Sequence, residues 1–172
     1  MLARVRTVAA IPRLTLLEKV VSPVDGFARY VFRGEGPDPF EAVRIPLASQ
    51  SGETFYAVCV SSQVGCAMGC AFCCTGRMGF RRDLSTWEII DQIIRIKIDS
   101  PHPLRSVVFM GMGEPMLNYD AVMRAVSILA EPCGMAMSPK SITISTSGVV
   151  PGIQRLITEK RPPKLIVSLS CA

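Results

Sequence analysis

No uncharged apolar run in this sequence is continuous enough to cross a membrane. The longest uncharged stretch, residues 54 to 76, is interrupted by polar residues and glycines, whereas a membrane-spanning helix needs about 20 consecutive, mostly apolar residues. No transmembrane helix is therefore expected. The basic opening segment has no acidic residue before Glu18, but Pro12 and Arg13 interrupt its apolar run, which argues against a cleaved targeting signal.

Charged residues and low-complexity segments are also scarce. Charged side chains make up 19% of the 172 residues, hydrophobic ones make up 49%, and the mean hydropathy is +0.34, so part of the apolar surface is expected to need a partner. No repeat period predicts a solenoid, and the length suits one domain. The net charge of +5 and the pI near 9.0 favour a polyanionic partner such as nucleic acid.

Histidine is nearly absent, with His102 as the single one, whereas the sequence contains seven cysteines. Four of these lie between Cys66 and Cys74, and such close spacing favours a metal site over disulfide bridges. Thiols that bind a metal suit a reducing compartment, so the sequence predicts a cytoplasmic protein.

Short β-branched runs alternate with helical periods along most of the chain, which predicts an α/β fold with a parallel sheet covered by helices. Residues 1–54 are expected to form a β-rich, hairpin-like lead-in, and residues 55–172 an α/β core. This core ends after its fourth strand, which leaves an unpaired apolar edge, so the sequence looks cut short. The predicted strands are residues 28–33, 41–46, 56–60, 106–110, 141–145 and 164–169, and helices are expected from the capping box of Ser85 and Glu88, from about Asn118 and from about Pro151.

The cysteines at 66, 70 and 73 stand at spacings of four and three residues in a glycine-containing loop. Thiolates are the usual ligands of iron-sulfur clusters, and a four-iron cluster held by only three of them keeps one iron open for another ligand. A closed zinc site would need a fourth donor, for which Cys74, Cys59 and His102 are candidates. Cys74 is interpreted as a packing residue, because the neighbour of a ligand usually points away from it.

Five ordered motifs carry a resemblance to a known family. The sequence is similar to the radical S-adenosylmethionine (SAM) superfamily and, within it, to the dual-specificity 23S rRNA and tRNA adenine-C2 methyltransferases. The resemblance covers residues 41 to 169. The motifs are Cys59-Val-Ser-Ser-Gln-Val-Gly-Cys66 with CxxxCxxC, Thr75-Gly-Arg-Met-Gly-Phe80, Met110-Gly-Met-Gly-Glu-Pro115 with Asn118, Ile144-Ser-Thr-Ser-Gly148-Val-Val-Pro151, and Val167-Ser-Leu169.

The resemblance implies a partial (βα) barrel of the radical SAM type with a 4Fe-4S cluster on Cys66, Cys70 and Cys73. It also implies that SAM binds the open iron and yields a 5′-deoxyadenosyl radical. The cofactor contacts that it implies are Gly113, Glu114, Ser145, Ser168, Leu169 and Ser170, although the family usually has His at position 170. Taken alone, the Gly-Glu-Pro segment and the serines are more typical of turns, but their place at the ends of predicted parallel strands favours ligand binding.

The same resemblance implies that Glu41 accepts a proton and that Cys59 helps to resolve a protein–RNA adduct, while a solvent-facing role remains open for Glu41. In this family the methyl group passes through a methylcysteine near the C-terminus, which no motif here matches; Cys133 and Cys171 are interpreted as structural. The implied partners are 23S rRNA, tRNA and an electron donor such as flavodoxin or ferredoxin. The alternatives are another radical SAM reaction and a non-catalytic iron-sulfur or zinc module that binds RNA.

Overall fold

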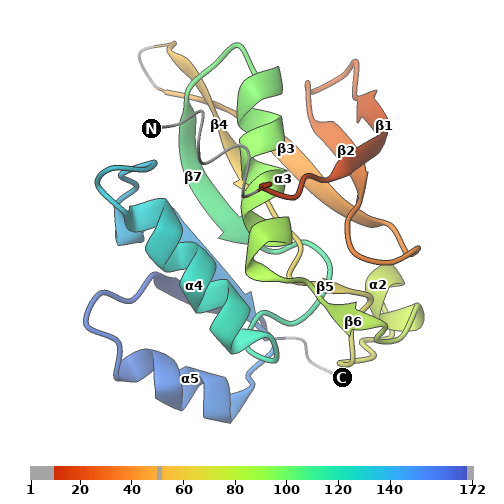
Figure 1. The fold of residues 1–172 in the computed structure, drawn as a ribbon, viewed down its shortest axis with the longest axis vertical. Coiled ribbons are helices and arrows are strands. Elements are labelled where there is room, and N and C mark those ends of the chain that lie inside the picture. The colour runs from red at the N-terminus through yellow and green to blue at the C-terminus, as the bar shows by residue number, and fades with distance from the viewer. Residues whose placement is uncertain (1–9, 50–51, 170–172) are drawn as a thin grey trace.

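Across the part of the chain that the structure describes, a seven-stranded sheet forms the body of the fold, in the strand order β1-β2-β3-β4-β7-β8-β9 (Figure 1). The computed structural model describes residues 10–49 and 52–169. The strands of this sheet are β1 (Thr15–Val21), β2 (Ala28–Arg33), β3 (Phe40–Ala48), β4 (Thr54–Cys59), β7 (Leu104–Phe109), β8 (Ile142–Thr146) and β9 (Lys164–Val167). The remaining elements are β5 (Gln63–Val64), β6 (Arg82–Asp83), α2 (Cys74–Arg77), α3 (Thr86–Asp99), α4 (Tyr119–Ala130), the 3-10 turn η1 (Pro139–Ser141) and α5 (Val150–Ile157).

The second half of the sheet is parallel and confirms the predicted α/β fold. Strands β4, β7, β8 and β9 pair in parallel, and α3, α4 and α5 lie between them in the chain. Strands β1, β2, β3 and β4 pair antiparallel, so the predicted lead-in and the parallel core contribute to one sheet. The expected boundary at residue 55 falls one residue inside β4.

Strand β1 was not predicted from the sequence. All seven of its residues are exposed, so it lacks the alternation of buried and exposed side chains that marks a half-buried strand. Its pairing with β2, from Thr15 opposite Arg33 to Val21 opposite Ala28, determines its conformation instead.

The hydrophobic core lies between the sheet and helices α3 and α4, which stand in front of the sheet in Figure 1. The predicted capping box of Ser85 and Glu88 begins α3. Inward residues recur on both helices at the helical period, as the sequence predicts. They are Ile89, Ile93 and Ile96 on α3 and Val122, Ala125, Val126 and Leu129 on α4.

The sequence predicts a parallel sheet covered by helices, but several residues of the predicted strands are not covered. Met110, Ile166 and Val167 are 46%, 45% and 42% exposed. Met110 lies just past the end of β7, and β9 is the edge of the sheet, so part of their surface has no neighbour to cover it. Among the helices of the described residues, none has the length and hydropathy of a membrane span.

Candidate functional site

The three clustered cysteines lie in a loop whose ends are joined by a two-stranded clip. Strand β5 pairs antiparallel with β6, with Gln63 opposite Asp83 and Val64 opposite Arg82. Inside the clip, the backbone N–H of Cys66 donates to the carbonyl oxygen of Gly79 at 3.2 Å. The clip therefore closes the loop at its neck and holds the cysteines beside the sheet.

Gly65 lets the two sides of this neck approach each other. Its φ angle is +73°, in the left-handed region that favours glycine, and a Cβ atom added there would stand 1.8 Å from the carbonyl oxygen of Gly79. We expect Gly65→Ala to lower the free energy of unfolding by about 2 to 3 kcal/mol, because it adds backbone strain to a steric clash. Urea denaturation tests this. Gly69→Ala is the matched control, because Gly69 also has a positive φ but has no atom within 4 Å of an added Cβ; an equal loss in both variants would contradict a contribution from the clash.

A cavity of about 330 Å³ brings the cysteine loop together with the carboxyl ends of β7 and β8 and with Ser168, which follows β9. In parallel α/β folds ligands bind at this end of the sheet. Its lining includes the following residues of the predicted site: Cys66, Cys70, Cys73, Gly113, Glu114, Ser145 and Ser168.

Of the other predicted site residues, the three that the structure describes, Glu41, Cys59 and Leu169, are not among those that line the cavity. Leu169 is 90% exposed, and Ser170 lies outside the described residues. Glu41 and Cys59 belong to strands β3 and β4 of the sheet. Among the described residues, the structure thus brings together the predicted cluster ligands and cofactor contacts except for Leu169, and it places the two residues assigned to catalysis outside the cavity lining.

The three thiols fit an iron-sulfur cluster by the chemistry of the donor set. All three line one cavity and are free cysteines, and each iron of a cluster takes its own thiolate, so the three need not converge on one point. Within the described ranges, no group of three or more His, Cys, Asp or Glu side chains has the arrangement of a site for one metal ion. The zinc alternative therefore gains no support from these residues.

The charge state of Cys66 depends on its surroundings. Burial raises the pKa of its thiol, and the neighbouring Glu114 carboxylate and the Cys70 and Cys73 side chains act in the same direction. In contrast, Cys74 is exposed and is not among the residues that line the cavity. It is the first residue of α2, immediately after Cys73.

Glu114 joins the ends of two strands. Its carboxylate accepts hydrogen bonds from the backbone N–H of Met116 at 3.0 Å and from both the N–H and the hydroxyl of Ser147 at 2.9 Å. Only 3% of the residue is exposed. Because a carboxylate offers about four acceptor positions, one remains for a further donor in the cavity.

Sequence reasoning missed Ser147 as a functional residue. It lies one residue past the end of β8, lines the cavity and is hydrogen-bonded to Glu114, which precedes it by 33 positions. The only available signal was its place in the strand-end motif. Nearby, the hydroxyls of Ser145 and Ser168 lie 3.2 Å apart, and the N–H of Ser168 donates to the carbonyl of Thr146 at 2.8 Å, which joins β8 to β9.

Glu41 and Cys59 share one face and one end of the sheet. Val43 pairs with Cys59, and Glu41 lies two residues before Val43 on the same face of β3. The Glu41 carboxylate accepts a hydrogen bond from Arg29 at 3.0 Å. Burial raises the pKa of Cys59 to about 11, although a backbone hydrogen bond with Met110 opposes the shift, so its thiol is protonated at neutral pH.

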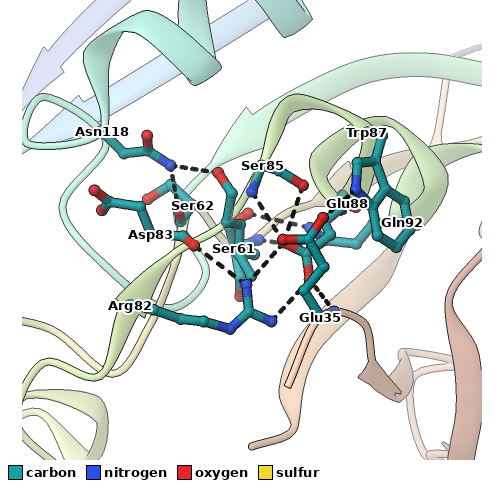
Figure 2. Close-up of polar contacts among 11 residues, drawn as sticks. Glu35, Ser61, Ser62, Arg82, Asp83, Ser85, Trp87, Glu88, Gln92 and Asn118 are labelled. Atoms are coloured by element: carbon teal, nitrogen blue, oxygen red, sulfur yellow. Dashed lines mark hydrogen bonds and ion pairs between the residues drawn. The ribbon is translucent and has the colours of Figure 1, made fainter. Parts of the chain in front are cut away.

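Polar side chains on α3 and at the start of α4 anchor the segment that leads into the cysteine loop (Figure 2). The Asn118 amide donates to the carbonyl oxygens of Ser62 and Leu84, each at 2.7 Å. The Gln92 side chain accepts from the N–H of Ser61 at 2.9 Å and donates to its carbonyl at 3.2 Å. The loop therefore starts and ends on segments fixed by buried hydrogen bonds.

A second anchor holds β6, the strand on the far side of the loop. Arg82 makes a bidentate ion pair with Glu88, with both N···O distances at 2.8 Å. The same carboxylate accepts from the N–H groups of Glu35 and Ser85, each at 2.9 Å. Figure 2 shows Glu88 at the centre of these contacts. The turn after β2, the clip and the start of α3 thus meet at one side chain.

Comparison with known proteins agrees with this architecture. The family model of the Radical SAM superfamily matches residues 60–166. A probable RNA methyltransferase of Myxococcus xanthus is 45% identical over 97% of this chain and 45% of its own length. The dual-specificity RNA methyltransferase RlmN of Syntrophobacter fumaroxidans is 48% identical over 86% of this chain and 42% of its own length.

A solved structure shares the fold. The crystal structure of a radical SAM methyltransferase from Sphaerobacter thermophilus matches with a TM-score of 0.85 and 41% identity, over 97% of this chain and 48% of that chain. The chain spans about half the length of the curated relatives it matches.

Proposed function

Since this chain belongs to the radical SAM superfamily, we propose that it carries the cluster and cofactor site of an RlmN-type RNA methyltransferase. The observation that carries the proposal is the cavity that the cysteine loop shares with the ends of β7 and β8 and with Ser168. A loop of three thiols beside a strand end with a buried carboxylate is an arrangement suited to hold a cluster next to an amino-acid ligand.

In this proposal, Cys66, Cys70 and Cys73 each hold one iron of a 4Fe-4S cluster and leave the fourth iron to SAM. When bound, the cluster supplies the electron for reductive cleavage of SAM. The remaining acceptor position of Glu114 receives a hydrogen bond from the SAM ammonium group. Ser145 and Ser168 contact the carboxylate or ribose of SAM, and Leu169 and Ser170 complete the same contact segment.

Glu41 is proposed to accept a proton, and Cys59 is proposed to help resolve the protein–RNA adduct. Their common face and common end of the sheet support this assignment, because a substrate lying over that face reaches both. Cys59 is protonated at neutral pH, because burial raises its pKa to about 11. It must therefore lose this proton before its sulfur can act on the adduct. Glu41 is the carboxylate nearest to it along that face of β3.

The proposed reaction is methylation of adenine C2 in 23S rRNA and in tRNA, through a methylcysteine, in the cytoplasm and with flavodoxin or ferredoxin as electron donor. The net charge of +5 suits a nucleic-acid substrate. The test is an anaerobic assay of the reconstituted protein with unmodified RNA, reductant and labelled SAM, beside a full-length relative. Formation of 5′-deoxyadenosine supports the cofactor site. Uptake of one zinc and no iron would overturn the proposal. If SAM is cleaved but neither protein methylates RNA, the site would be reassigned to another radical SAM reaction.

Glu114 offers a direct test of the cofactor contact. Replacing it with Ala should weaken SAM binding by about 1.5 to 3 kcal/mol, the scale of one hydrogen bond to a charged group. Calorimetry on the reconstituted protein measures this. Glu131→Ala is a control, because that carboxylate is exposed at the end of α4. Unchanged affinity would leave Glu114 as a residue that only joins the two strand ends.

A further inference from the structure

We propose that Gln63 is a positioning residue that sets the spacing between the cysteine loop and the Gly113–Glu114 turn. The inference rests on the proposed function, because it concerns the two sides of the same cofactor site. Gln63 is the first residue of the clip, and it is 1% exposed. In the sequence it stands inside the motif that runs from Cys59 to Cys66, and no role was assigned to it there.

The carboxamide of Gln63 binds both sides of the site at once. Its Nε2 donates to Oδ1 of Asp83 at 2.7 Å, across the clip that closes the cysteine loop. Its Oε1 accepts from the backbone N–H of Glu114 at 2.8 Å. One rigid planar group therefore spans the distance between the neck of the loop and the turn after β7.

Gly113 brings the turn against this side chain. A Cβ atom added to Gly113 would stand 2.5 Å from Cβ of Gln63 and 2.7 Å from its Cγ. The backbone N–H of Gln63 also donates to the carbonyl of Met112 at 3.2 Å. The turn is thus packed directly on Gln63, and a change in the position of Gln63 must move the turn.

The link continues from Glu114 to the end of β8. The Glu114 carboxylate accepts from the N–H and hydroxyl of Ser147. Asp83, Gln63, Glu114 and Ser147 consequently form one chain of buried or partly buried hydrogen bonds, and its last two members line the cavity. The three cysteines of the loop, Ser145 and Ser168 line the same cavity as Glu114 and Ser147.

Only a carboxamide satisfies both partners of Gln63. Glutamate at this position would place a carboxylate against that of Asp83, and methionine would leave both the Asp83 oxygen and the Glu114 N–H without this partner. A double variant can nevertheless keep both hydrogen bonds, with the donor and the acceptor between residues 63 and 83 exchanged. In Gln63→Glu combined with Asp83→Asn, the amide of residue 83 donates to the carboxylate of residue 63, which still accepts from Glu114.

The test compares SAM affinity and cluster content in these variants of the reconstituted chain. We expect Gln63→Met and Gln63→Glu to keep nearly full iron content, to bind SAM at least about tenfold more weakly, and to lose the change that SAM produces in the electron paramagnetic resonance spectrum of the reduced cluster. Adding Asp83→Asn to Gln63→Glu should restore affinity to within about threefold of the wild type. Without cofactor, the amide resonances of Glu114 and Ser147 should shift in Gln63→Met.

Gln92→Met is the matched control. Gln92 is also a fully buried glutamine that holds the segment before the loop, but it bonds to Ser61 and makes no contact with Glu114 among its hydrogen bonds. It should lower thermal stability and leave SAM affinity within about threefold of the wild type. Equal loss of affinity in both Met variants, or wild-type affinity in Gln63→Met with a full cluster, would overturn the inference. Failure of the wild-type chain to take up iron or to bind SAM would instead refute the proposed function and, with it, this inference.

Discussion

Replacing Cys66, Cys70 or Cys73 with Ala should abolish uptake of a four-iron cluster, whereas Cys74→Ala should leave it nearly intact. This result is expected because the first three thiols line one cavity and Cys74 does not. With only two thiolates, the cluster would have two irons without a protein ligand, and water and oxygen would reach it from the cavity mouth. Iron and sulfide content after anaerobic reconstitution, with electron paramagnetic resonance of the reduced protein, measures the effect.

Cys133→Ala is the matched control for the loss of a thiol, because Cys133 is an exposed cysteine away from the loop. It should retain the iron content of the wild type. If Cys74→Ala were as damaging as Cys70→Ala, the assignment of three ligands would have to be replaced by one that includes Cys74. Uptake of a single zinc that depends on all four clustered cysteines would favour the non-catalytic module instead.

The local part of this site could be predicted from the sequence. Cysteine spacing, the capping box at Ser85 and the helical period of α3 depend on residues a few positions apart, and these patterns carry their own geometry. The four parallel strands were predicted for a similar reason, because their β-branched runs are short and continuous. The cavity lies where the ends of those strands meet, which is the usual place for a ligand site in a parallel sheet.

The environment of the individual side chains could not be predicted. Glu114 lines the cavity and also accepts hydrogen bonds from Ser147. The second contact joins residues 33 positions apart, so no local pattern predicts it. The clip of β5 and β6 is two residues long on each side, too short for a period to appear. Gln63 bonds to Asp83 and Glu88 bonds to Glu35, partners on other elements that no spacing rule connects to them.

Glu88→Ala is expected to cost about 3 to 5 kcal/mol in the free energy of unfolding, the range for removing one partner of a buried ion pair. Glu88 has no exposed surface, and its carboxylate accepts from Arg82, Ser85 and Glu35. Without it, the Arg82 side chain, which is only 25% exposed, loses its counter-ion, and two backbone N–H groups lose their acceptor. Urea denaturation measures the loss, with Glu131→Ala as an exposed control that should change stability little.

The same side chain makes stability depend on pH in acid. Burial acts to raise the pKa of Glu88, but hydrogen bonds from Arg82 and from the N–H groups of Ser85 and Glu35 outweigh it and hold the pKa below its ordinary value of 4.5. The stabilisation is therefore complete above pH 4.5 and is lost as the pH falls through the lower pKa of the folded state. Glu88→Gln should flatten this acid limb of the stability profile. A profile that stays as steep in the variant would assign the acid sensitivity to other carboxylates and would contradict a central role for Glu88 in anchoring the clip.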